Sequence, residues 1–147
     1  LGTDAFYVIN GDSVWMAGMK CPLLRLAEAW DPKTMDVLLM VAPLSNVASF
    51  EGLGDFTMTQ LGKLSRRKEK TVAPFVYMGI SIINPNILAK APRGSFSLNW
   101  VYDRAIESDR LHGIVHDGLW YHISTPSDLE LARNRFLNDH SLPVPFF

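Results

Sequence analysis

The sequence predicts an α/β fold, with a mixed, mainly parallel sheet and helices packed against it. Two apolar runs, 5–9 and 37–41, have the composition of strands buried on both faces, and a segment with helical spacing, 21–30, lies between them. A strand, a crossover helix and a second strand in this order make a right-handed βαβ unit, whose two strands run parallel. The 147 residues, 48% of them hydrophobic and 20% charged, suit a single domain with one core.

The first third of the chain supplies the elements of this unit. The strand 5–9 runs out into the polar turn Asn10-Gly11-Asp12. The helix begins at Cys21-Pro22, because proline suits a first helical turn, and Asp31-Pro32 ends it. The second strand covers 36–41.

The middle of the chain predicts a loop, a hairpin and a long strand. Residues 42–54 lose periodicity and gain proline and glycine, which is typical of a loop. Alternating faces in 55–59 and 63–66 predict a hairpin, and the charged run 66–70 is interpreted as a solvated turn. The strand 74–83 contains Gly79, which indicates a bulge, a close approach to the backbone, or packing under a helix.

The last third predicts two helices around two short strands. Ser97 is placed to cap a helix that runs to Ser108, and the strands 111–116 and 119–123 follow. A second helix starts at Thr125, with Asp128 at the third position after this cap. The apolar, proline-broken tail 142–147 docks either on its own domain or on a second copy, which leaves a homo-oligomer open.

Composition excludes several classes of function. A net charge of −1 gives no basic field for nucleic acid or an anionic membrane surface, and no apolar run reaches the roughly 18 to 20 residues of a membrane span. Cys21 is the single cysteine, which excludes a disulfide framework and a zinc site of several thiolates. We therefore expect a cytoplasmic protein that binds neither nucleic acid nor membrane.

The histidines and tryptophans outside these motifs predict core or surface positions. His112, His116 and His140 show no metal-ligand spacing. The four tryptophans, Trp15, Trp30, Trp100 and Trp120, are too widely separated in sequence to form a stacking platform for bases.

The turn Asn10-Gly11-Asp12 is the sharpest candidate for chemistry. In open parallel sheets, ligands bind beyond the carboxyl ends of the strands, and a glycine before a carboxylate lets a ligand approach the backbone. Asp12 is well placed to hold a hard cation such as Mg²⁺. The same tripeptide also makes a good turn with no further role, so both interpretations stay open.

Five segments in order give the sequence a resemblance to a known family. They are 6–12 (FYVINGD), 54–56 (GDF), 75–82 (FVYMGISI), 94–98 (GSFSL) and 116–126 (HDGLWYHISTP). Together they resemble the sugar-phosphate nucleotidyltransferases, most closely the bacterial N-acetylmuramate-1-phosphate uridylyltransferases and mannose-1-phosphate guanylyltransferases. The resemblance implies a Rossmann-like, glycosyltransferase-A-type sheet, of which residues 1–147 form the C-terminal part of a single domain with the front βα units missing.

The resemblance also implies a reaction and a set of site residues. A sugar 1-phosphate would attack the α-phosphorus of UTP or GTP to give a nucleotide sugar and pyrophosphate, with Mg²⁺ as cofactor. Asp12 would be the catalytic residue and a metal ligand. The substrate-binding residues would be Asn10 and Gly11, with Gly54 and Asp55 lining the sugar pocket and Gly79 letting the backbone pass close to the sugar phosphate.

Two departures from the family pattern qualify this expectation. Family members carry a second metal-binding aspartate where this chain has His122, which binds metal, holds a metal-bound water or phosphate, or is an inactive substitution. Histidine favours Mn²⁺, Co²⁺ or Zn²⁺ over Mg²⁺, and Asp117 supplies the second carboxylate only if its turn folds back.

The family's glycine-rich loop with its arginine and lysine is also not matched by these residues, since 51–54 lacks a following Lys or Arg. The chain alone is therefore expected to be inactive without the N-terminal part of its domain. The alternative function is a non-catalytic protein of the same fold that binds a nucleotide sugar or a sugar phosphate.

Overall fold

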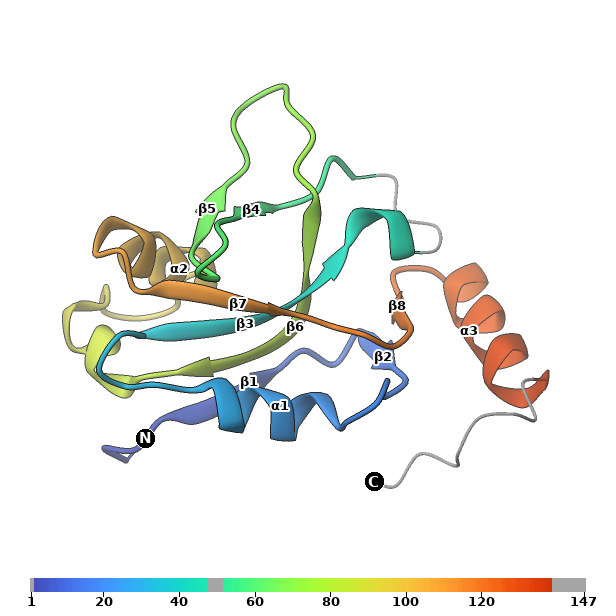
Figure 1. Ribbon diagram of the computed structural model, residues 1–147, viewed down its shortest axis with the longest axis horizontal. Coiled ribbons are helices and arrows are strands. Elements are labelled where there is room, and N and C mark those ends of the chain that lie inside the picture. Colours follow the sequence, from blue (N-terminus) through green and yellow to red (C-terminus); the bar gives the residue numbers. More distant parts are fainter. Residues whose placement is uncertain (1, 48–51, 139–147) are drawn as a thin grey trace.

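A six-stranded sheet with helices on its two faces and a separate two-stranded ribbon make up the fold (Figure 1). The computed structural model describes residues 2–47 and 52–138. The strands are β1 (Phe6–Ile9), β2 (Ser13–Trp15), β3 (Val37–Pro43), β4 (Phe56–Met58), β5 (Leu64–Arg66), β6 (Phe75–Ile83), β7 (Leu111–Val115) and β8 (Trp120–His122). The helices are α1 (Pro22–Ala29), α2 (Leu98–Glu107) and α3 (Pro126–Asn138), with short 3₁₀ turns η1 (Leu44–Asn46) and η2 (Pro85–Lys90).

Strand β6 organises the sheet, whose order is β5-β4-β6-β3-β7, with β1 also paired to β6. All pairings of β6 are antiparallel, and the parallel pairing is that of β3 with β7. The prediction of a mainly parallel sheet is therefore wrong, although the mixed α/β class is confirmed. The reason is that β6 lies between β1 and β3, so α1 connects two strands that run in the same direction without being neighbours.

Strand β1 is half-exposed, so the expectation that both its faces are buried is wrong. Tyr7 and Ile9 are 42% and 47% exposed, whereas Phe6 and Val8 pack against the core. Within the described residues β1 pairs with β6 alone, which leaves its other edge uncovered. The Tyr7 hydroxyl donates to the carbonyl of Leu23, which ties the strand to α1.

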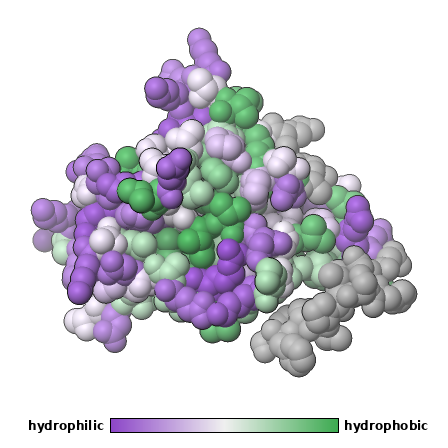
Figure 2. Space-filling view, in the orientation of Figure 1, coloured by the Kyte–Doolittle hydropathy of each residue, from purple (hydrophilic) through white to green (hydrophobic). Residues whose placement is uncertain are grey.

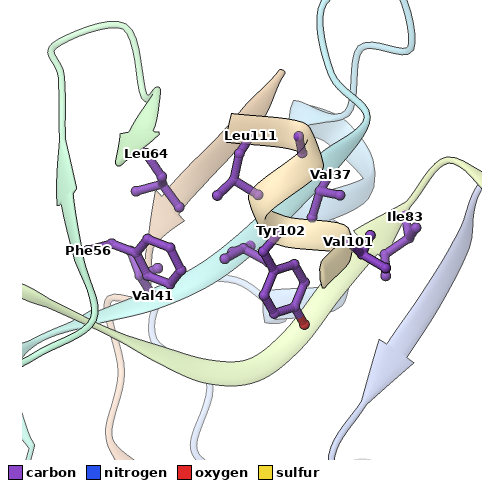
Figure 3. Close-up of a cluster of buried hydrophobic side chains, with 10 residues drawn as sticks. Val37, Val41, Phe56, Leu64, Ile83, Val101, Tyr102 and Leu111 are labelled. Carbon is purple, nitrogen blue, oxygen red and sulfur yellow. The ribbon is translucent and has the colours of Figure 1, made fainter. Parts of the chain in front are cut away.

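The core has two parts, one on each face of the sheet, and β3 contributes to both. Val37, Leu39 and Val41 face α2 and the β4–β5 hairpin, a cluster shown in Figure 3, and alternate with residues that face α1. This two-sided burial confirms the prediction for β3 and explains its unbroken apolar sequence.

The β4–β5 hairpin folds back over the sheet and is held there by arginines of the charged run. Arg66 Nε pairs with Asp103 of α2 at 2.8 Å, and Arg67 Nε donates to the carbonyl of Gly54 at 3.1 Å. The prediction of a solvated turn is therefore wrong for the start of the run and right for its exposed end, 68–70.

In Figure 2 apolar residues gather in the middle of the visible face and hydrophilic residues surround them.

The helix boundaries follow the predicted capping signals. Ser97 Oγ accepts from the amide of Asn99 at the start of α2, and Thr125 with Asp128 forms the reciprocal bonds of a capping box at the start of α3. In the described part of the chain, no helix combines the length and the hydropathy that a membrane span requires. The tail 142–147 and His140 lie outside the described residues.

Candidate functional site

Asp12 and His122 lie side by side at the carboxyl end of β1. The ribbon formed by β2 and β8 places Ser13 opposite His122, and the amide of Ile123 donates to the carbonyl of Asp12 at 2.8 Å. His122 Nδ1 is 4.0 Å from Asp12 Oδ2, and the two side chains are 40% and 51% exposed. The carboxylate therefore faces solvent at the edge of the sheet where the sequence predicts a ligand.

The β2–β8 ribbon that creates this pair was not predicted from the sequence. Ser13–Trp15 is three residues long, too short for a periodic signal, and its partner is more than a hundred positions away. Trp15 and Trp120 stand opposite each other in the ribbon and pack into the core cluster on the α1 face. Neither segment carries an alternating pattern, because Ser13 shares a face of the ribbon with Trp15 and Trp120 shares one with His122.

Gly79 gives β6 the bulge that lets the Asn10-Gly11-Asp12 turn come close. Its φ of +79° lies in the left-handed region, and the pairing with β3 shifts register at this point. A Cβ here would stand 2.9 Å from Asn10 Cβ and 3.1 Å from Ser13 Oγ, and Asn10 donates its amide to the Gly79 carbonyl at 2.8 Å. The predicted bulge and close approach are both confirmed, and the approaching group is Asn10.

Two different strands share one edge of β6 and leave an interval between them. Strand β4 pairs at Phe75, and β1 pairs from Ile80 onward. Between these points Asp55 Oδ2 accepts from the amide of Tyr77 at 2.8 Å, and Asn10 bonds to Gly79. We call this stretch, from Phe75 to Ile80, the β6 interval; Asp55 borders one end and the Asp12 turn borders the other.

Gly54 allows the close backbone contact that positions Asp55. It is buried with a φ of +77°, and a Cβ at this position would overlap the carbonyl oxygen of Ala73. Glycine is therefore required for the approach of two backbone segments, and it sets the position from which Asp55 reaches Tyr77.

Asp117 does not join Asp12. Its carboxylate pairs with Arg25 at 2.8 Å and accepts from the amide of Met19, so its turn is fastened to α1 and the segment before it. Over residues 2–47 and 52–138 there is no group of three His, Cys, Asp or Glu side chains arranged to hold a metal. Within the described residues, the Asp12–His122 pair therefore has no third side chain of these types placed to complete a metal site.

The other histidines are structural, as predicted for His112 and His116. They are 7% and 2% exposed, and burial lowers the pKa of each imidazole. Both rings are therefore neutral at neutral pH and belong to the core.

Comparisons of sequence find a uridylyltransferase and a bifunctional protein among the relatives of the chain. It is 35% identical over 126 residues to N-acetylmuramate alpha-1-phosphate uridylyltransferase of Caulobacter vibrioides, covering 86% of the chain and 52% of that protein. It is 27% identical over 149 residues to the bifunctional protein GlmU of Methanococcus maripaludis strain C7, covering 92% of the chain and 32% of that protein. The chain spans about half the length of the first of these relatives and about a third of the second. No family model matches it.

Comparisons of structure confirm the fold that the resemblance implies. A protein from Bacillus anthracis assigned as a glucose-1-phosphate thymidylyltransferase superposes with a TM-score of 0.70 at 13% identity, over 99% of the chain and 58% of that protein. The inositol-1-phosphate CTP transferase of T. maritima gives 0.63 at 14% identity, over 98% and 60%. These neighbours share the glycosyltransferase-A-like fold, and the chain resembles the C-terminal part of such proteins.

Proposed function

We propose, from this similarity to the sugar-1-phosphate nucleotidyltransferases, that residues 1–147 are the C-terminal part of a single nucleotidyltransferase domain. The enzyme would join a nucleoside triphosphate, UTP or GTP, to a sugar 1-phosphate. A phosphate oxygen of the sugar 1-phosphate attacks the α-phosphorus, the bond to the β-phosphate breaks, and pyrophosphate leaves with the displaced electron pair. The observation that carries the proposal is the convergence of Asp12 and His122 at the solvent-facing carboxyl end of β1.

The donor set at this edge fits a divalent cation held partly by substrate. Mg²⁺ in phosphoryl-transfer sites is bound by one or two carboxylates, with substrate phosphates and water completing its shell. Asp12 supplies one carboxylate and His122 one imidazole nitrogen, which suits Mn²⁺ or Co²⁺ better than Mg²⁺. A cation bound here would neutralise charge on the phosphates during displacement.

The remaining site residues are assigned to the sugar phosphate. Asn10 and Gly11 form the turn that presents Asp12, and Gly79 is the bulge against which this turn is held. Gly54 and Asp55 border the other end of the β6 interval. We place the sugar along this interval, with its phosphate toward Asp12.

The proposal requires the part of the domain that precedes these residues. In-line displacement depends on fixed cationic groups around the triphosphate, and in the described part of the chain Asp12 has His122 as its sole ionic partner. Within 2–47 and 52–138, β1 has a paired neighbour on one edge alone, and its other edge suits docking of that preceding part. A single cysteine fits the reducing cytoplasm, where we place the enzyme.

The decisive experiment uses a protein that carries these residues together with the preceding part of its domain. Pyrophosphate release is measured with UTP and GTP against several sugar 1-phosphates, each with Mg²⁺ and with Mn²⁺. Asp12→Asn should lower kcat at least about a hundredfold, because it removes a charge that stabilises the reacting phosphates. Asp109→Asn, a control at an exposed carboxylate paired with Lys63, should leave turnover unchanged.

A second candidate function is suggested by His122 itself. With histidine at this position, the protein could bind a sugar phosphate or nucleotide sugar without catalysis. Calorimetry separates the two: binding that needs no metal, together with absent turnover in every pairing, favours the binding protein. A metal requirement that Asp12→Asn abolishes favours the enzyme.

A further inference from the structure

The side chain of Arg67 joins two backbone segments beside Asp55. Its Nε donates to the carbonyl of Gly54 at 3.1 Å, and its own backbone amide donates to the carbonyl of Asp55 at 2.9 Å. Its Nη1 donates to the carbonyls of Lys68 and Thr71, at 3.3 Å and 3.2 Å. Arg67 therefore fastens the residues before β4 to the start of the connection from β5 to β6, which stands out from the sheet in Figure 1.

The peptide group between Gly54 and Asp55 needs a restraint on its carbonyl. Gly54 has a φ of +77°, and glycine has more backbone conformations open to it than other residues, so its carbonyl is otherwise free to turn. The amide of Asp55 donates to the carbonyl of Phe75 at 2.7 Å. Arg67 holds the carbonyl of the same peptide group, and a hydrogen bond from a charged donor is stronger than one between neutral groups. The peptide group from which the Asp55 side chain starts is therefore fixed at both its amide and its carbonyl.

The carboxylate of Asp55 has one oxygen bound within the fold. Oδ2 accepts from the amide of Tyr77 at 2.8 Å, whereas Oδ1 accepts no hydrogen bond within 2–47 and 52–138. The residue is half-buried, so part of it meets solvent. An ionised carboxylate only accepts hydrogen bonds, and the hydroxyl groups of a sugar are suitable donors. The direction in which Oδ1 points depends on the peptide group that Arg67 holds.

We infer that Arg67 is a positioning residue for the sugar 1-phosphate: by holding the Gly54 carbonyl, it sets where Asp55 Oδ1 meets a sugar hydroxyl. The inference rests on the proposed function, because it takes Asp55 as a residue that borders the sugar. In this arrangement Arg67 acts on the sugar through Asp55. Its effect on sugar binding should therefore disappear once Asp55 can no longer accept a hydrogen bond there.

The test is a double-mutant cycle of Arg67→Gln and Asp55→Asn in the protein that includes the preceding part of the domain. Asparagine can keep its carbonyl on the amide of Tyr77, but it replaces Oδ1 by an NH₂ group, which does not accept. Affinity for N-acetylmuramate 1-phosphate is measured by calorimetry without nucleotide. Arg67→Gln should weaken binding about tenfold in the unaltered protein, the effect of one misplaced hydrogen bond, and less than about twofold in Asp55→Asn.

Arg110→Gln is the matched control. The Arg110 guanidinium also donates to three backbone carbonyls, those of Pro32, Lys33 and Met35. These carbonyls precede β3, whose first residue pairs with Ile83, whereas Asp55 lies beside Phe75 at the other end of β6. Arg110→Gln should lower the urea midpoint and leave the affinity for the sugar phosphate unchanged. In turnover assays, Arg67→Gln alone should raise KM for the sugar 1-phosphate, with KM for the nucleoside triphosphate unchanged.

Amide exchange tests the positioning of Asp55 without a ligand. Arg67→Gln should speed exchange of the Tyr77 amide about tenfold, because a displaced Asp55 carboxylate no longer accepts from it. The amides of β3, in the middle of the sheet, report global unfolding and serve as the reference. Relative to them, Arg110→Gln should leave the Tyr77 amide unchanged.

Three results would overturn the inference. They are equal weakening by Arg67→Gln with and without Asp55→Asn, unchanged affinity in Arg67→Gln, and an equal loss of affinity in Arg110→Gln. Failure of the proposed enzyme gives a different result: the unaltered protein shows the coupling between Arg67 and Asp55 but releases no pyrophosphate. If the unaltered protein does not bind the sugar phosphate, the placement of the sugar fails with the proposed function, and faster exchange at Tyr77 then shows that Arg67 positions Asp55 for another purpose.

Discussion

Replacing Gly79 by alanine tests whether the bulge of β6 positions the Asp12 turn. A φ of +79° costs an L residue about 1–2 kcal/mol. The new Cβ would also stand 2.9 Å from Asn10 Cβ and 3.1 Å from Ser13 Oγ, closer than side-chain carbons normally approach. Relief requires the turn to move, which strains the hydrogen bond from Asn10 to Gly79 and adds about 1 kcal/mol. We therefore expect Gly79→Ala to lower the free energy of unfolding by about 2–3 kcal/mol.

Gly94→Ala provides the control that separates the two contributions. Gly94 has a φ of +90°, and a Cβ there would have open space on all sides. This variant should show the backbone cost of about 1–2 kcal/mol alone. Urea unfolding followed by tryptophan fluorescence measures both variants, and a titration with Mn²⁺ measures the site.

The contrast between the two glycines decides the outcome. If the turn is held by the bulge, Gly79→Ala loses more stability than Gly94→Ala and binds Mn²⁺ more weakly, whereas Gly94→Ala binds it as the unaltered protein does. Equal losses of stability with unchanged Mn²⁺ binding would refute the reasoning, because they would show that the turn keeps its place without contact to Gly79.

Three further variants probe the fold around the site. Leu39→Ala should lower the free energy of unfolding by about 2–5 kcal/mol in urea titrations, because Leu39 is fully buried where β3 meets α2. Thr125→Ala should cost about 1 kcal/mol and increase amide exchange in the first turn of α3. Hydrogen bonds, foremost those with Thr125, hold the pKa of the Asp128 carboxyl below its ordinary 3.8. The contribution of ionised Asp128 to this cap is therefore complete above pH 3.8 and is lost as the pH falls through the lowered pKa. Burial lowers the pKa of His116 from 6.5, so its contribution to stability should be complete above pH 6.5 and decline as the pH falls below this value. His116→Gln should reduce this slope in urea titrations at several pH values.

Local signals predicted most of the helices and strands. Pro22, Ser97 and Thr125 each mark a helix start because a cap or a first-turn proline acts within a few residues of itself. The apolar run of β3 predicted burial on both faces because each face of the sheet requires its own set of side chains. These features depend on neighbours in sequence, so the sequence alone predicts them.

Strand direction and distant pairings could not be predicted in the same way. An apolar run such as β6 has the same composition whether its neighbours run parallel or antiparallel, and this ambiguity produced the wrong prediction of a mainly parallel sheet. Arg66 was interpreted as part of a solvated turn because its partner Asp103 belongs to α2, far along the chain.

The residues of the candidate site also differ in whether a local sequence pattern could predict them. Asp12 was predicted from its place after an apolar strand, a local pattern that any open sheet would share. His122 was brought to attention by the family resemblance alone, since the ribbon that places it 4.0 Å from Asp12 joins segments that are distant in sequence.

The sharing of one β6 edge by β4 and β1 restricts how the length of this stretch can change. An insertion of one residue between Tyr77 and Ile80 would turn every later side chain of β6 to the opposite face and so reverse its core contacts. An insertion of two would preserve the faces but would separate β1 from β4 by about 7 Å more. The distance between the points where β4 and β1 pair with β6 can thus change only by about 7 Å at a time. Adaptation to ligands of slightly different size should therefore occur by side-chain replacement at constant strand length.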